Sequence, residues 1–419
     1  MKAPQKKSIT KKPASSSRRP LVSRKPRVRR KRPAPAFPPP VRRPSAGDRL
    51  LAVFAAGQRD AGLDEFIATM AAHGHDVLEL AVPEPTPAAA RAVIRSHPEV
   101  AAGRVQGIVL IGRDVTPFRF QPRSDSGPLT DYSDLPFGSD FSHFTAAGDA
   151  PLVAAEIAGL LDARPATYQQ GQWVSRIFEL HRVFLDNLRS TAPPQTNNML
   201  IVNADPNSDD PQLQETWRTQ YGLLASGQNA RFAFRGPDFA TSELLPFLEA
   251  NLTNATFVSL TDHGTSINLA NLPGTRNGQP QLPSLPDVVE LAACATGRWM
   301  DDAENPQIRG LAETALERGA LAVIAPQCLL AWSFAKGSVG RPTNYNPATD
   351  RTNQGIHNVA PWLDVWPREG SLGRAQAVAV TETLGFLQES AYMDKGYIVH
   401  QVLCGHSLFG DGTVEFRSA

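Results

Sequence analysis

From residue 47 onward, short apolar runs typical of β-strands alternate with stretches that have the apolar spacing of helices. In the first half, the predicted strands are 50–54, 77–82 and 107–112, and the predicted helices are 62–73, 87–96, 151–163 and 172–189. The run at 107–112 is bounded by glycines, as expected for a strand buried in a parallel sheet. The alternation predicts an α/β fold in which helices flank mostly parallel sheets.

The second half of the chain repeats the same alternation. Its predicted strands are 199–204, 256–261, 288–293 and 320–325, and its predicted helices are 211–224, 242–251 and 308–318. The stretch 190–196 (STAPPQT) has the composition of a linker. We therefore expect two α/β subdomains, 47–192 and 193–419. The sequence contains no nucleotide-binding glycine motif and no apolar run of transmembrane length.

The first 46 residues differ from the rest in charge. Of the 42 basic residues in the chain, 16 lie there together with 10 prolines and no acidic residue, so residues 47–419 hold 26 basic and 41 acidic residues. Such a segment cannot bury enough apolar surface to order itself, which predicts a disordered tail. The tail either binds nucleic acid or another polyanion through its charge, or is simply a solvated segment.

The cysteine content bears on the compartment. Three cysteines cannot build a disulfide framework, which indicates either a reducing compartment or thiols kept for chemistry. The start of the chain has no apolar stretch of signal-peptide length. We expect a cytoplasmic protein with no membrane span.

Two reactive residues follow predicted strands directly. His263 comes after the strand 256–261, and Cys294 comes after the strand 288–293. Ligand sites of open parallel sheets lie at the carboxyl ends of the strands, so neighbouring strands would bring these two side chains together. A lone cysteine at a strand end is more often a small core residue than a nucleophile. A lone histidine after a strand is more often a polar residue whose hydrogen bonds are satisfied than a catalytic one. The pair is more informative than either residue alone.

The pair has the chemistry of a thiol nucleophile and its acid–base partner. The thiolate is the reactive form of cysteine, and an imidazole can stabilise it and then protonate a leaving amine. Gly264, which has no Cβ, would let its N–H join that of Cys294 in an oxyanion hole. These residues predict nucleophilic catalysis.

The motif His263-Gly264 followed by Ala293-Cys294 resembles the caspase-like (clan CD) cysteine peptidases, and its surroundings look most like the gingipain-type family. Further similarity lies, in the order expected for that family, at 66–82, 107–117, 128–134, 311–326 and 402–416. The resemblance implies a caspase-like fold and a cysteine endopeptidase that acts on polypeptides and needs no cofactor or metal.

The resemblance also implies roles for individual residues. Cys294 would be the nucleophile, His263 the general acid and base, and Asp205 the acidic residue that orients the histidine. Asp210, with Asp209 as the alternative, would read a basic P1 side chain of the substrate, and Trp332 would form a wall of that pocket.

Two positions depart from the gingipain pattern. Asp262 precedes His263 where that family has glycine, as in the legumain branch of the clan. Gly412 stands in place of a proline in the terminal Gly-Asp-Pro segment.

Three other functions compete with peptidase activity. The chain could be a catalytically silent scaffold or binding module of the same fold, or the basic tail could be the functional element. His400, Cys404 and His406, expected on a terminal strand, have a spacing that also suits zinc, although no second ligand pair lies nearby. Cys328 follows an apolar strand and is expected in the core.

Overall fold

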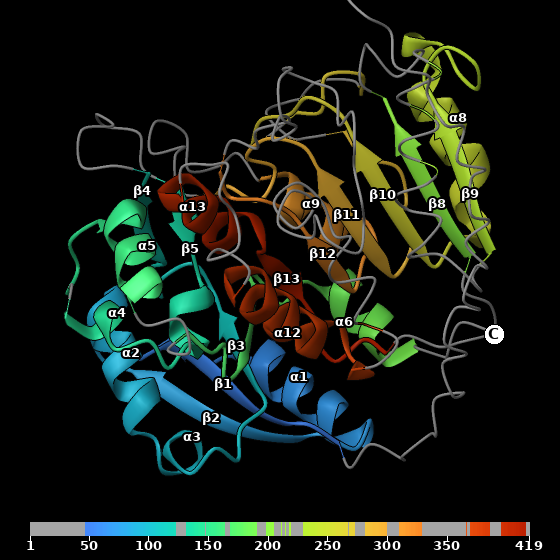
Figure 1. The fold of residues 1–419 in the computed structure, drawn as a ribbon. Helices are drawn as coiled ribbons and strands as arrows, with labels where there is room; N and C mark the ends of the chain where they lie inside the picture. The colour runs from blue at the N-terminus through green and yellow to red at the C-terminus, as the bar shows by residue number, and fades with distance from the viewer. Residues whose placement is uncertain are drawn as a thin grey trace, which may run out of the picture. The chain divides into compact units, whose positions relative to one another are not determined.

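The computed structural model contains a ten-stranded sheet with the strand order β2-β1-β3-β7-β13-β12-β11-β10-β8-β9 (Figure 1). In that order, the strands are Asp76–Val82, Arg49–Ala55, Gly107–Ile111, Trp173–Ile177, Leu408–Gly410, Ala322–Ile324, Val288–Ala292, Phe257–Thr261, Asn198–Asn203 and Asn229–Phe234. A second sheet has the order β5-β4-β6, with strands Asp131–Ser133, Phe118–Gln121 and Leu152–Val153.

The structure describes most of the chain after the basic tail. The described residues are 47–122, 131–146, 148–163, 168–190, 198–204, 211, 214, 218, 229–266, 268–272, 281–299, 310–328, 366, 369–385 and 395–415. The tail 1–46 and the boundary expected at 192/193 lie outside these ranges, so the disorder of the tail, its polyanion binding and the two subdomains stay predictions.

Strand direction divides the large sheet at its centre. Every neighbouring pair is parallel except β12 and β13, which are antiparallel. The strands β1, β2, β3, β7 and β13 therefore run one way, and β8 to β12 run the other way. The mostly parallel α/β fold predicted from the sequence is confirmed.

Helices cover both faces of this sheet. They are α1 Ala61–Ala72, α2 Pro87–Ser96, α3 Pro98–Ala101, α4 His143–Ala146, α5 Ala154–Ala163, α6 Arg182–Ser190, α8 Leu244–Asn251, α9 Leu311–Glu317, α12 Leu372–Gly385 and α13 Lys395–Gly405, with 3₁₀ turns at Leu135–Gly138, Thr241–Glu243 and Leu252–Asn254. Within the described ranges, none of the helices has both the length and the apolar character that crossing a membrane requires.

Strand β1 shows why the sheet is buried on both faces. Leu50 and Ala52 belong to an apolar cluster that contains buried residues of α1, α6, α8 and α9. Leu51 and Val53 belong to a second cluster, which contains residues of α2, α5 and α13. Because successive side chains of a strand point to opposite faces, a continuous apolar run is what this position requires.

The predicted helix 172–189 is wrong in its first part. Residues Trp173–Ile177 form strand β7, which lies between β3 and β13, and only Arg182–Ser190 form a helix. Arg176 obscures the strand pattern, because it is a charged residue inside a fully buried strand. Its guanidinium donates to both carboxylate oxygens of Asp134, at 2.8 and 2.6 Å, and a charge can be buried when it is paired in this way.

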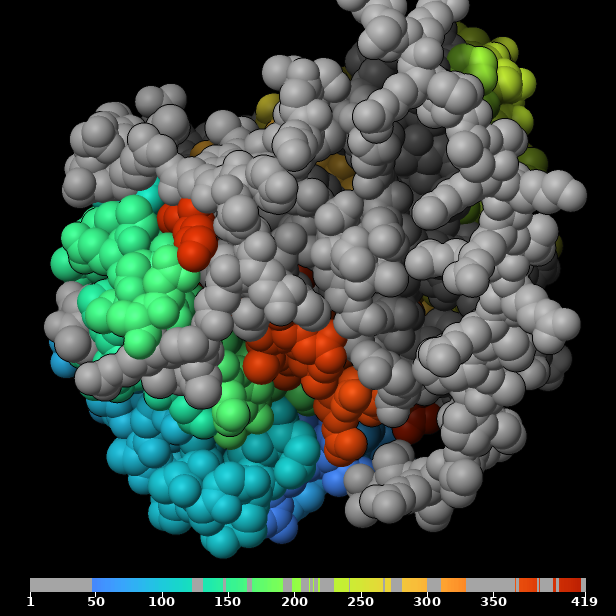
Figure 2. All heavy atoms as spheres, in the orientation of Figure 1, coloured from blue at the N-terminus to red at the C-terminus, as the bar shows by residue number. Residues whose placement is uncertain are grey.

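The segment around residue 400 is also corrected by the structure. His400 and Cys404 lie on α13 rather than on a strand, and strand β13 begins only at Leu408. Figure 2 shows α13 beside α5 at the surface, and Lys395 Nζ lies 2.7 Å from an oxygen of Asp162 across this helix pair. In the described part of the chain, His400, Cys404 and His406 form no cluster of converging ligand atoms, so the zinc alternative has no support.

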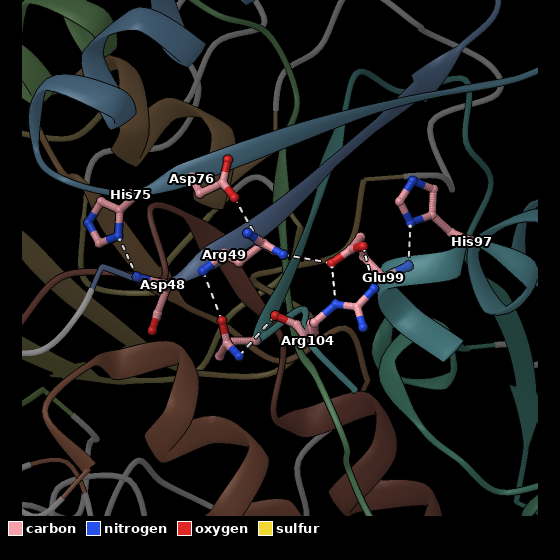
Figure 3. A network of polar contacts seen from close by, with 8 residues as sticks. Asp48, Arg49, His75, Asp76, His97, Glu99 and Arg104 are labelled. Atoms are coloured by element: carbon pink, nitrogen blue, oxygen red, sulfur yellow. Dashed lines mark hydrogen bonds and ion pairs between the residues drawn. The ribbon is translucent and has the colours of Figure 1, made fainter. Parts of the chain in front are cut away.

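A polar network fixes the start of β1 (Figure 3). Arg49 lies between two carboxylates, 2.6 Å from Asp76 on β2 and 2.6 Å from Glu99 on α3. The Arg104 guanidinium, followed by that of Arg49, lowers the pKa of Glu99 to about 2. Glu99 therefore remains ionised over the neutral range, and Arg49, which it contacts, pairs in register with Asp76 across the two strands.

Three glycines surround the buried indole of Trp173 on β7. A Cβ on Gly107, Gly373 or Gly412 would lie 2.2, 2.4 or 2.5 Å from atoms of this ring. The glycine at 412, which departs from the gingipain pattern, thus has a packing reason, because the ring fills the space that a larger residue would need.

Candidate active site

The register between β10 and β11 places His263 and Cys294 at equivalent positions. The two strands are parallel neighbours, and Thr261 pairs with Ala292. His263 and Cys294 each follow two residues beyond this pair, so both emerge at the same edge of the sheet. His263 is exposed and Cys294 is half-buried. The expectation that the two strands are neighbours is confirmed.

Gly264 brings the histidine loop against the segment that carries Cys294. A Cβ on Gly264 would lie 2.8 Å from Cβ of Ala293 and 3.0 Å from Cγ2 of Thr296. These two residues lie on either side of Cys294 in the turn. Glycine is therefore required here for a close approach of the two segments.

The backbone turns sharply after Cys294. Ala295 has a φ of +56°, and it is the only non-glycine residue with a left-handed backbone among the described residues. This conformation costs about 1–2 kcal/mol for a residue with a Cβ. Hydrogen bonds offset that cost: Ala295 N donates to Cys328 O and Gly297 N to Pro326 O, both at 2.8 Å. The Thr296 hydroxyl donates to Leu291 O at 2.8 Å.

Asp262 organises the loop that carries His263. Its buried carboxylate accepts from the backbone N–H of His263 at 2.7 Å and from Asn271 N and Nδ2, both at 2.8 Å. Burial raises the pKa of Asp262, and the three N–H donors oppose that rise. Asn271 Nδ2 also donates to Ala204 O at 2.6 Å, which ties the loop to the end of β8. The aspartate that departs from the gingipain pattern therefore acts on loop structure.

The two remaining cysteines are buried in the core. Burial raises the pKa of Cys328 and of Cys404 well above the usual thiol range. Neutral buried thiols are poor nucleophiles. Cys328 is thus the core residue expected from the sequence, and Cys294 is the accessible one of the three.

Four predicted site residues lie outside the described residues: Asp205, Asp209, Asp210 and Trp332. The last described residue of the β8 segment is Ala204, whose N–H donates to Thr261 O at 2.8 Å. This bond places the end of the segment beside the strand that leads to His263. The roles of the four residues stay predictions, as does the oxyanion hole formed by Gly264 and Cys294.

Sequence reasoning missed a buried ionic group beside the Cys294 turn. Arg298 forms an ion pair with Asp131, and Nε2 of His400 lies 2.9 Å from Oδ2 of the same aspartate. The three residues are far apart in the chain and no spacing rule connects them. Two of the three gave a sequence signal, Asp131 as part of a segment with family resemblance and His400 as a candidate zinc ligand, but neither signal pointed to this ionic group.

Substitution of Gly264 by alanine is expected to destabilise the protein by about 1–3 kcal/mol, as overpacking typically does. The new Cβ would have to displace Ala293 or Thr296. Urea denaturation measures the loss. The double variant Gly264→Ala/Ala293→Gly should recover part of it, because the second change removes the nearer of the two clashing atoms. A fully additive pair would contradict the contact.

Comparison with known proteins places this arrangement among solved folds. No family model and no curated protein matches the chain. Gingipain R, an Arg-specific cysteine proteinase, matches with a TM-score of 0.55 at 12% identity, over 90% of this chain and 80% of that one. A structure described only as a protease matches with a TM-score of 0.57 at 15% identity, over 89% and 79%. The chain therefore has the caspase-like α/β fold of gingipain R.

Proposed function

We propose that this protein is a cysteine endopeptidase with Cys294 as nucleophile and His263 as general acid and base. The observation that carries the proposal is the β10–β11 register, which sets both residues two positions beyond the pair Thr261 and Ala292. The close approach of Gly264 to Ala293 and Thr296 supports it. So does the likeness of the fold to that of a cysteine proteinase.

The reaction follows from these groups. The Cys294 thiolate attacks the carbonyl carbon of the scissile bond, and the N–H groups of Gly264 and Cys294 stabilise the resulting oxyanion. The C–N bond breaks as the His263 imidazolium gives its proton to the leaving amine, which leaves a thioester on Cys294. A water molecule then gives a proton to His263 and attacks the thioester, releasing the new carboxylate and the thiol.

Two further roles belong to the proposal. Asp205 orients His263 and stabilises its imidazolium form, as the third group of a catalytic triad does. Asp210, or Asp209 in its place, binds a basic P1 side chain against Trp332. A carboxylate favours arginine over lysine through a bidentate contact.

A peptide library that varies the P1 residue tests this function. Cleavage is expected after arginine, with at least about a tenfold preference over an uncharged side chain of similar length. Blocking free thiols with iodoacetamide should stop it. Absence of cleavage at every P1 residue would overturn the proposal and favour a silent scaffold.

A matched pair of variants identifies the acidic residue of the P1 pocket. Asp210→Asn should reduce the preference for arginine about tenfold or more, whereas Asp209→Asn should leave it unchanged. The reverse result would assign the role to Asp209. If neither variant changes the preference, P1 recognition by this loop is wrong, although thiol catalysis still stands.

A further inference from the structure

The turn that follows Cys294 is held by more than its own backbone. Arg298, four residues after Cys294, donates its N–H to Ala295 O at 2.9 Å. It thereby contacts the left-handed residue that shapes the turn. The Arg298 side chain then leaves the turn and is mostly buried, with 18% of its surface exposed. A group that fixes the Arg298 side chain therefore also restricts Ala295, and with it the neighbouring Cys294.

Asp131 holds the Arg298 side chain. It is the first residue of β5, is almost fully buried, and forms an ion pair with the Arg298 guanidinium. Its other carboxylate oxygen lies 2.9 Å from Nε2 of His400 on α13, which is also buried. A buried carboxylate is retained only when cationic or hydrogen-bonding partners compensate its desolvation, so the three side chains depend on one another.

The charges of Asp131 and Arg298 also act on Cys328, which follows β12 and supports the turn. Cys328 accepts the Ala295 N–H through its carbonyl. Asp131 contributes to the raised pKa of the Cys328 thiol, whereas Arg298 opposes it, so both charges lie close to that thiol. The ionic group and Gly264 therefore reach the turn through different residues, Arg298 in one case and Ala293 and Thr296 in the other.

We infer that Asp131 is a positioning residue, which holds the Cys294 turn in its reactive conformation through Arg298 and is itself held by His400. The inference rests on the proposed role of Cys294 as the nucleophile. The effect of Asp131 would be transmitted through the Arg298 side chain and the hydrogen bond from Arg298 N to Ala295 O. Loss of the ion pair would let the turn relax and move the sulfur away from His263.

Steady-state kinetics of Asp131→Asn test the inference. We expect kcat to fall about 10²-fold, the loss that a displacement of about 1 Å produces, with KM changed less than about twofold. Asp162→Asn is the matched control, because it removes the surface ion pair of Asp162 on α5 with Lys395 on α13 and should leave both constants unchanged. Equal kcat in Asp131→Asn and wild-type protein would overturn the inference.

A second pair of variants separates positioning from simple loss of stability. Arg298→Lys keeps the positive charge and should retain more kcat than Arg298→Met, even where their melting temperatures agree. If Asp131→Asn does not fold, His400→Gln, which keeps an N–H group near Asp131, is expected to lower kcat more mildly. Lower melting temperatures with unchanged kcat in every folded variant would show a purely structural role and contradict the inference.

One readout does not depend on peptidase activity. Iodoacetamide alkylation, mapped to Cys294 by mass spectrometry, should be about tenfold slower or more in Asp131→Asn, because a displaced thiol loses the imidazole that favours its thiolate. Equal rates in wild-type, Asp131→Asn and Asp162→Asn protein overturn the inference. An altered rate in a protein that cleaves no peptide would uphold the positioning role and reject the proposed function alone.

Discussion

Replacement of Cys294 by alanine is expected to abolish covalent labelling by an arginyl ketone probe and to reduce peptide hydrolysis about 10⁴-fold or more. The reason is chemical, because no other group in the candidate site can form the thioester. Cys294 lies two residues beyond the end of β11 and is half-buried, whereas the other two cysteines are buried. Labelling followed by mass spectrometry of the modified peptide measures the effect directly.

The chain offers its own controls for this prediction. Cys328→Ala and Cys404→Ala should both remain labelled, because burial raises the pKa of these thiols and keeps them neutral. Each variant removes one thiol from the same protein and is treated with the same probe. A difference in labelling between the variants therefore reports which thiol reacts. Labelling that persists in Cys294→Ala would sink the assignment of the nucleophile.

Substitution of Gly107 by alanine should destabilise the protein more than Gly264→Ala does, because the new Cβ would lie closer to its neighbours. The added Cβ would lie 2.2 Å from two atoms of the Trp173 ring. Trp173 is almost fully buried, and Gly373 and Gly412 contact the same ring, so the indole has no space to move into. We expect a loss of about 3 kcal/mol, at the upper end of the usual cost of overpacking.

Gly159→Ala is the matched control for this experiment. Gly159 is exposed on α5, and nothing lies within 4 Å of the added Cβ, so the same change should stabilise the protein by about 0.5–1 kcal/mol. Urea denaturation compares the two variants. In the Gly107→Ala background, Trp173→Leu should recover part of the loss. Equal stabilities of the two glycine variants would contradict the role of the ring.

Apolar patterning predicted seven strands of the large sheet and several of its flanking helices to within a few residues, but it missed the three short strands β4, β5 and β6 and the edge strand β9. Helix α1 was expected at 62–73 and is Ala61–Ala72, and β11 was expected at 288–293 and is Val288–Ala292. Each of these elements is continuous in sequence and buries either one regular face or both faces. The local periodicity of apolar residues is therefore sufficient to predict its bounds. The positions of His263 and Cys294 at strand ends followed for the same reason.

The two wrong assignments share a different cause. Arg176 on β7 and His400 on α13 are buried polar residues whose partners, Asp134 and Asp131, lie far away in the sequence. A local sequence pattern assigns such polar residues to the surface. The partners that compensate the cost of burying them come close only in the folded chain. The strand β7 and the helix α13 were therefore misassigned.

The sequence by itself determined the α/β alternation, the contrast between the basic tail and the acidic remainder, and the two reactive residues with their glycine. Only the tertiary structure decided that β10 and β11 pair in the register that aligns His263 with Cys294. It alone revealed the left-handed Ala295 and the ion pair of Arg298 with Asp131. Register and ion pairing join residues distant in the chain, and they form only when the whole sheet packs.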